Sequence, residues 1–253
     1  KPVALPPLLT LLESILEQQR HRHAFQARRD SHGLEPFLGT SPAIRRLEQE
    51  SQRVLAASTP IMLVGETGTG KGVLARWLHQ QGPRTAEAVV EFHCASVTGV
   101  DLHQELFGRS PDEGTVGQGT RSGVLESADR GTLVLVDVGD LDAAAQAALL
   151  RVVSEGRFRR AGEQRDRGVD VRLISTEHRE ASTLIQESGF RQDLFFRLGA
   201  LTLALPPLRD RPEDIPALAE ALLRRVAVEL GQRPPSLSDG ALKVLTHHDW
   251  PGN

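Results

Sequence analysis

A glycine-rich loop that ends in a lysine constrains this chain more than any other feature of its sequence. The loop reads Gly65-Glu66-Thr67-Gly68-Thr69-Gly70-Lys71. It follows the short apolar run 61–64, which predicts a buried parallel strand, and precedes a helical pattern over 73–80. Glycines let the backbone N–H groups of such a loop face one point, and the helix N-terminus adds partial positive charge there. The loop therefore predicts a phosphate site, with Lys71 reaching the β- and γ-phosphates.

The residue after the lysine departs from the usual phosphate loop. That position commonly carries a serine or threonine whose hydroxyl helps to hold Mg²⁺. Here it is Gly72, which has no side chain to offer. Phosphate binding is thus predicted without a hydroxyl ligand for the metal.

The rest of the chain alternates strand and helix patterns before it becomes helical. Further strands are predicted over 89–92, 132–138 and 169–176, with the clearest intervening helix over 143–155. Such units predict an α/β fold, a parallel sheet covered by helices. After Pro206-Pro207, helices are predicted over 215–230 and 238–247, with Ser238 as an N-cap. We expect an α/β subdomain over 34–205 and a small helical subdomain over 206–253.

The first 33 residues have a different pattern. Leucines and isoleucine at helical spacing over 8–16 precede a charged stretch over 18–30, which predicts an amphipathic helix and a polar linker. Two interpretations remain open. The helix packs on its own domain, or it joins the domain to an upstream regulatory domain; the start at Lys1 without a methionine favours the second.

Composition bears on whether this segment binds nucleic acid or membranes and on the compartment in which the protein is expected. Thirty basic and 33 acidic residues give a net charge of −3, so an electrostatic DNA clamp is not expected in this segment. Aromatic residues make up 4% of the chain and tyrosine is absent, which argues against a base-stacking surface. One cysteine, no long apolar run and no secretion signal predict a cytoplasmic protein without a membrane partner.

Several motifs together resemble one family, the AAA+ central domain of NtrC-like bacterial enhancer-binding proteins, which act on sigma-54 RNA polymerase. Besides the loop at 65–71, the matching segments are Phe37-Leu38-Gly39-Thr40-Ser41-Pro42, Glu105-Leu106-Phe107-Gly108, Gly139-Asp140-Leu141, Phe190-Arg191-Gln192-Asp193-Leu194, Leu205-Pro206-Pro207-Leu208-Arg209 and Trp250-Pro251-Gly252-Asn253. The resemblance covers about residues 34 to 253. It implies an AAA+ P-loop NTPase fold followed by a truncated helical lid, with ATP or ADP as ligand. It also implies that Phe37 and Leu38 form an apolar pocket over the adenine, although core packing explains them equally well.

Position by position, the resemblance implies a degenerate catalytic site. The family strand ends in an Asp-Glu pair that holds Mg²⁺ and activates water, and here Val136-Asp137 stands in its place. Asp137 is the remaining candidate for water activation or for holding Mg²⁺. His93 and His178 occupy positions where the family carries asparagines, and His178 is the candidate phosphate sensor. Arg191 and Arg197 resemble the arginines that reach the nucleotide of a neighbouring subunit, so self-association as a ring or dimer is implied.

The loop that contacts the polymerase in the family has changed as well. The register places Asp112-Glu113-Gly114-Thr115-Val116-Gly117 at the Gly-Ala-Phe-Thr-Gly-Ala signature, with Gly114 in place of phenylalanine. An acidic tip without an aromatic side chain loses the apolar anchor that such a contact needs. The family's helix-turn-helix domain, its route to DNA, is expected beyond Asn253.

Our leading hypothesis is a nucleotide-binding AAA+ domain of a transcription regulator, with weak or absent ATP hydrolysis and without activation of sigma-54 polymerase. The alternative is an active ATPase motor that uses Asp137 and His178 in place of the usual residues. An interaction module without nucleotide is disfavoured by the intact loop. A cyclic dinucleotide site is disfavoured because no arginine lies over 34–41.

Overall fold

Alternating apolar runs and amphipathic helices build a parallel sheet with helices on both faces, followed by two further helices. The structure is a computed structural model that describes residues 35–96, 99–110, 120–186 and 189–253. Residues 35–253 form one compact unit. The amphipathic segment predicted over 1–33 and the loop at Asp112–Gly117 lie outside the described residues.

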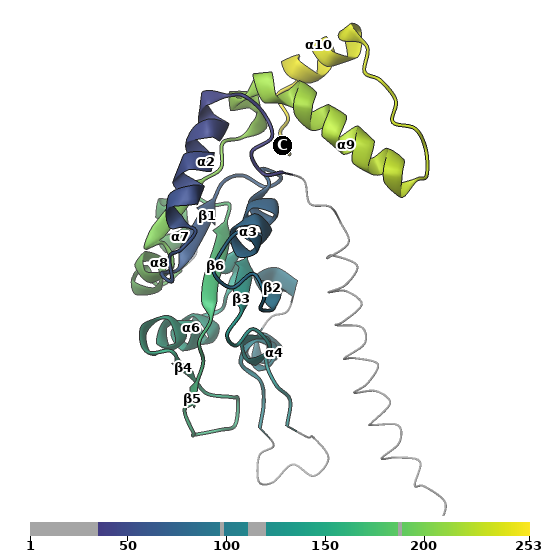
Figure 1. The fold of residues 1–253 in the computed structure, drawn as a ribbon. Coiled ribbons are helices and arrows are strands. Elements are labelled where there is room, and N and C mark those ends of the chain that lie inside the picture. The colour runs from purple at the N-terminus through teal and green to yellow at the C-terminus, as the bar shows by residue number, and fades with distance from the viewer. Residues whose placement is uncertain (1–34, 97–98, 111–119, 187–188) are drawn as a thin grey trace, which may run out of the picture. The chain divides into compact units, whose positions relative to one another are not determined.

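The main sheet has the strand order β2-β3-β6-β1-β7, and all of its pairings are parallel (Figure 1). Its strands are β1 (Ile61–Val64), β2 (Val89–His93), β3 (Thr132–Val136), β6 (Arg172–Glu177) and β7 (Leu201–Ala204). A separate antiparallel pair consists of β4 (Arg157–Phe158) and β5 (Arg167–Gly168). Parallel strands place their carboxyl ends at one edge of the sheet, where α/β proteins bind ligands.

Two hydrophobic clusters lie on opposite faces of this sheet. One face packs on α2 (Pro42–Val54) and α3 (Lys71–Gln80). The other packs on α4 (Val100–Phe107), α5 (Val124–Ser127), α6 (Ala143–Glu155), α7 (Ala181–Gln186) and α8 (Gln192–Leu198). The alternation along β3 is clear: Leu133 and Leu135 face the second cluster, whereas Val134 and Val136 face the first. Val136 therefore points to the side of the sheet that carries α3.

Two α-helices follow the sheet. They are α9 (Ile215–Glu229) and α10 (Asp239–His247), and they pack on each other (Figure 1). Four short 3₁₀ turns complete the described elements: η1 (Cys94–Ser96), η2 (Val138–Asp140), η3 (Leu208–Asp210) and η4 (Pro212–Asp214). Ser238 caps α10 as predicted, since its hydroxyl accepts a hydrogen bond from the N–H of Ala241 at 3.2 Å.

Several predicted boundaries were wrong by a few residues. The strand predicted over 132–138 ends at Val136, because Asp137 adopts a left-handed conformation with φ of 56°. The strand predicted over 169–176 begins at Arg172 and extends through Glu177. Strand β7 was not predicted, and Leu203 of that strand is buried against the α2–α3 side of the sheet.

No helix within the described ranges is both long and apolar enough to span a membrane.

Candidate functional site

The predicted phosphate loop joins β1 to α3 at the carboxyl edge of the sheet. Gly68 and Gly70 have φ of +87° and +101°, a region that residues with a side chain rarely adopt. Gly70 lies at the N-terminus of α3, and no side chain of the described part of the chain caps that helix. Its first N–H groups and the positive end of the helix dipole therefore suit an anion such as a phosphate.

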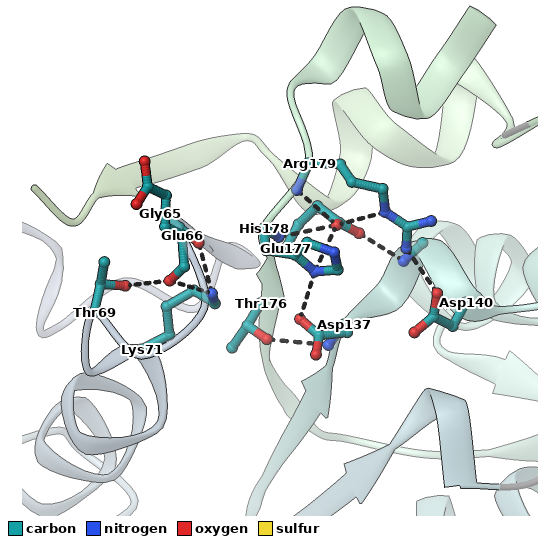
Figure 2. Close-up of polar contacts among 11 residues, drawn as sticks. Gly65, Glu66, Thr69, Lys71, Asp137, Asp140, Thr176, Glu177, His178 and Arg179 are labelled. Atoms are coloured by element: carbon teal, nitrogen blue, oxygen red, sulfur yellow. Dashed lines mark hydrogen bonds and ion pairs between the residues drawn. The ribbon is translucent and has the colours of Figure 1, made fainter. Parts of the chain in front are cut away.

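Lys71 lies within the curl of this loop. Its Nζ donates to the carbonyl oxygens of Gly65 and Glu66, at 2.6 and 3.1 Å (Figure 2). Burial lowers the pKa of Lys71, and this effect is only partly offset by the negative charges of Asp137 and Glu177. A half-buried ammonium gains stability from a nearby anion, and the contact of Lys71 with phosphate stays a prediction.

Asp137 and His178 face each other across the ends of β3 and β6. The His178 Nδ1 and the Asp137 Oδ1 lie 3.3 Å apart (Figure 2). The N–H of Asp137 donates to the Thr176 hydroxyl at 3.0 Å, which anchors the turn that follows β3. The fold thus brings three predicted site residues, Lys71, Asp137 and His178, to one edge of the sheet, while Val136 stays among the apolar side chains beneath α3.

Glu177, a buried carboxylate that the sequence analysis missed, organises this edge. One carboxylate oxygen, Oε2, accepts the N–H of Gly139 at 2.8 Å. The other, Oε1, accepts the N–H groups of His178 and Arg179 at 2.9 and 3.0 Å, together with the Arg179 Nε at 3.0 Å. The Arg179 Nη2 continues to Asp140 at 2.8 Å. Glu177 thereby ties η2 to the loop after β6 (Figure 2).

The pKa of Glu177 reflects two opposing causes. Burial raises the pKa, but the hydrogen bonds from Arg179 and from the N–H of His178 outweigh it and lower the pKa below its ordinary value. Glu177 is therefore an ionised group with its acceptor capacity filled. An acidic residue at the end of a parallel strand, next to His178, is the sequence signal that could have pointed to it.

The two arginines predicted to act on a neighbouring subunit lie at α8: Arg191 is the N-cap residue just before the helix, and Arg197 is in its last turn. Arg191 and Arg197 are both exposed. Arg191 forms a paired contact with Asp193, in which its Nε and Nη2 lie 3.1 and 2.8 Å from the two carboxylate oxygens. Phe196, between the arginines, is 63% exposed. The backbone N–H of Arg191 also donates to the Gln146 Oε1 on α6 at 2.8 Å. A role of Arg191 and Arg197 at the nucleotide of a neighbouring subunit stays a prediction.

The predicted adenine residues have a core environment. Phe37 is buried, and its ring lies 4.7 Å from the ring of Trp77 in an edge-on arrangement. Leu38 is half-buried. This packing explains Phe37, and a contact of Phe37 or Leu38 with adenine stays a prediction.

Arg209 in η3 and Asn253 after α10 make direct contacts with the phosphate loop. Arg209 pairs with Glu66 at 2.8 Å, and the Asn253 Nδ2 donates to the carbonyl oxygen of Thr67 at 3.0 Å. The hydrogen bonds from Arg209 and Asn253 lower the pKa of Glu66 to about 2. These contacts link residues that the sequence analysis treated only as parts of separate motifs.

A second set of contacts fixes the start of the domain. Asp214 is buried and accepts hydrogen bonds from the N–H groups of Thr40 and Ser41, at 2.6 and 2.8 Å, and from the Ser41 hydroxyl. Arg211 donates to the carbonyl oxygen of Thr69 at 3.3 Å. The residues before α9 therefore hold both the phosphate loop and the N-terminus of α2.

Comparison with known families matches nearly all of the described chain. Residues 37–204 match the family described as Sigma-54 interaction domain, and residues 209–253 match the one described as AAA+ ATPase lid domain.

Curated relatives and solved structures are similar over most of the chain. The Nif-specific regulatory protein of Klebsiella pneumoniae is 40% identical over 221 residues, which is 87% of this chain and 42% of the relative. The response regulator protein PilR of Pseudomonas aeruginosa is 35% identical over all 253 residues, or 56% of its own length. NtrX from Brucella abortus, solved in complex with ATP, has a TM-score of 0.81 and 33% identity, with coverage of 100% of this chain and 54% of NtrX. The chain thus spans about half the length of these relatives.

Proposed function

The chain belongs to the sigma-54 interaction domain family of AAA+ transcriptional regulators, and from this membership we propose that it binds ATP or ADP as a regulatory ligand and hydrolyses ATP weakly or not at all. The nucleotide would then regulate the protein by binding one of its two conformational states more tightly, which shifts the equilibrium toward that state. The phosphate loop with Lys71 supports binding, and NtrX, which was solved with ADP and with ATP, is similar over the whole chain.

One observation carries the weak-hydrolysis part of this proposal. Phosphoryl transfer needs neutralised charge and an in-line water at the γ-phosphate. Val136 lies among apolar side chains on the α3 side of the sheet, where the family's aspartate is expected by resemblance. Asp137 is one methylene shorter than the expected glutamate, and its carboxylate lies beside His178. Val136 therefore offers no ligand for Mg²⁺, and Asp137 is poorly suited to activate the attacking water.

The proposal extends to partners of the whole protein. Phe196 and Arg197 on α8 and Arg191 just before it are exposed, which suits self-association in a ring or dimer. The sequence at Asp112–Gly117, with Gly114 in place of phenylalanine, argues against the usual contact with sigma-54 polymerase. We further propose that a helix-turn-helix segment outside these residues binds DNA, in the cytoplasm.

Titration calorimetry with ATP and ADP tests the binding, and a phosphate-release assay tests hydrolysis. Lys71→Ala should weaken binding at least about tenfold, since a tenfold change corresponds to 1.4 kcal/mol, less than a charge-assisted hydrogen bond commonly contributes. Lys243→Ala is the matched control, because Lys243 is exposed on α10. Equal binding by wild type and Lys71→Ala would contradict the assigned site. Turnover near 1 s⁻¹, ordinary for an enzyme, would contradict weak hydrolysis.

The second candidate is an active ATPase, which the 3.3 Å approach of His178 Nδ1 to Asp137 Oδ1 favours. In that case Asp137 orients His178 or water, and His178 senses the γ-phosphate. Asp137→Ala should then abolish phosphate release and leave binding intact, whereas Asp101→Ala, at an exposed residue of α4, should change neither. Turnover that survives Asp137→Ala rules this candidate out.

A further inference from the structure

The carboxylates near the phosphate loop do not form a site for a divalent cation. A P-loop protein ordinarily holds Mg²⁺ with a hydroxyl after the lysine and a carboxylate at the end of a neighbouring strand. The corresponding residues here are Gly72 and Val136. Val136 places apolar atoms on the α3 side of the sheet. A side chain added at Gly72 would find only the Arg76 Nη1 within 4.0 Å, so the hydroxyl is missing although space for it exists.

The remaining acidic side chains are engaged with other groups. Glu177 accepts four hydrogen bonds from nitrogen donors and is 1% exposed. Asp140 pairs with Arg179 at 2.8 Å, and Asp137 lies 3.3 Å from His178. At a nucleotide site Mg²⁺ commonly keeps several waters and takes one or two carboxylates besides the phosphates, so the engagement of these carboxylates is what bears on the metal. Within the described ranges, no group of three His, Cys, Asp or Glu residues could hold a metal ion.

Groups that suit an anion already face the place where phosphates would lie. Lys71 lies within the loop, and the N-terminus of the ten-residue helix α3 has no side-chain cap. His178 reaches the same edge and is 37% exposed. Lys71 and the helix dipole suit phosphate charge without a metal, and His178 and the loop N–H groups lie where they can add hydrogen bonds. Metal binding and phosphate binding are therefore separable in this chain.

We propose that this domain binds its nucleotide without a divalent cation, so that Mg²⁺ is neither a ligand of the protein nor a requirement for affinity. The inference rests on the proposed nucleotide binding and specifies how that site works. Gly72 and Val136 are the residues that remove the metal requirement. The nucleotide is then recognised through its phosphates by Lys71 and the loop N–H groups.

The test compares the affinity for ADP and for ATP in excess MgCl₂ and in excess EDTA, by titration calorimetry on the intact chain. For the wild type, the two dissociation constants should agree within about twofold. Val136→Asp restores the strand-end carboxylate and should make binding metal-dependent, with EDTA weakening it about tenfold or more, or 1.4 kcal/mol. Val136→Ala, which adds no oxygen, should behave as the wild type does.

Gly72→Thr provides an independent variant if Val136→Asp fails to fold, because open space surrounds Gly72. It should also introduce metal dependence, although by less. Wild-type binding that is lost in EDTA overturns this inference and leaves the proposed function standing. Absence of binding in both buffers overturns both. Metal-independent binding by folded Val136→Asp and Gly72→Thr variants overturns the assignment to these two residues.

Discussion

Removing the Glu177 carboxylate should destabilise the domain more than any surface substitution of an acidic residue. In Glu177→Ala, the N–H groups of Gly139, His178 and Arg179 lose their acceptor, and the Arg179 guanidinium loses its buried partner. Each buried donor without a partner costs about 1–3 kcal/mol, and breaking a buried ion pair costs about 3–5 kcal/mol. Water reaches the Arg179 side chain, which is 23% exposed, so the three backbone donors dominate. Three such donors together cost about 3–9 kcal/mol. Their contacts with Glu177 are only partly buried, so we expect the lower part of this range, a loss of about 3–5 kcal/mol in the free energy of unfolding.

Urea unfolding followed by circular dichroism measures this loss. A domain of this size loses about 2–4 °C in Tm for each kcal/mol, so the expected fall in Tm is roughly 6–20 °C. Glu220→Ala is the matched control, because Glu220 is 60% exposed and pairs with Arg224 at 3.5 Å within α9. Such a surface pair contributes about 0–1 kcal/mol. A loss below about 1 kcal/mol in Glu177→Ala refutes the view that Glu177 ties η2 to the loop after β6.

The contribution of Glu177 to stability should also depend on pH. The pKa of Glu177 is lower in the folded protein than its ordinary value of 4.5. A lowered pKa stabilises the folded state fully above the ordinary value, and this stabilisation is lost as the pH falls through the folded value. The stability difference between wild type and Glu177→Gln should therefore be largest at neutral pH and shrink in acid. A difference that grows as the pH falls would contradict this assignment.

The other predictions concern single groups near the same edge of the sheet. Gly139→Ala should destabilise the domain by about 1–3 kcal/mol in urea unfolding, because its Cβ would lie 2.3 Å from the Arg179 Nη2 and 2.5 Å from the Glu177 Oε2. Arg209→Gln should raise the pKa of the Glu66 carboxyl from about 2 toward 4.5, as measured by carbon-detected NMR titration, and an unchanged pKa would rule out Arg209 as the main cause. The Cys94 thiol should resist alkylation in the native state at neutral pH, since burial raises its pKa to about 12, and rapid modification of the folded domain would contradict this.

Some elements of the fold could be predicted from local sequence because their physical causes are local. The glycines at 68 and 70 permit the backbone of the phosphate loop, and the run Ile61–Val64 has the continuous apolar character of a buried parallel strand. Ser238 supplies the N-cap of α10 from its own position. Strand β7 gave a weaker signal, because its four residues alternate in burial and become a strand only by pairing with β1.

The residues of the candidate site also divide into those that could be predicted from the sequence and those that depend on the fold. Lys71 was predicted from the phosphate-loop motif itself. Asp137 and His178 were predicted because the family resemblance places a catalytic glutamate and a phosphate-sensing asparagine at their positions. Glu177 was missed, because an acidic side chain at a strand end gives no local sign of whether it faces solvent or a buried set of N–H donors. The answer depends on Gly139, which is 38 residues away in sequence and close in the fold.

The sequence by itself determined that this protein is an α/β domain with a phosphate loop, and that Gly72 and Val136 lack the usual metal ligands. Backbone conformation and residue chemistry decide these points, and both act over a few neighbouring residues. Only the tertiary structure decided how the carboxylates are engaged. The Glu66–Arg209 contact joins residues 143 positions apart, and the Asp137–His178 contact joins residues 41 positions apart. Such contacts form where strand ends and loops meet, so charge and metal preference at this edge depend on the assembled fold.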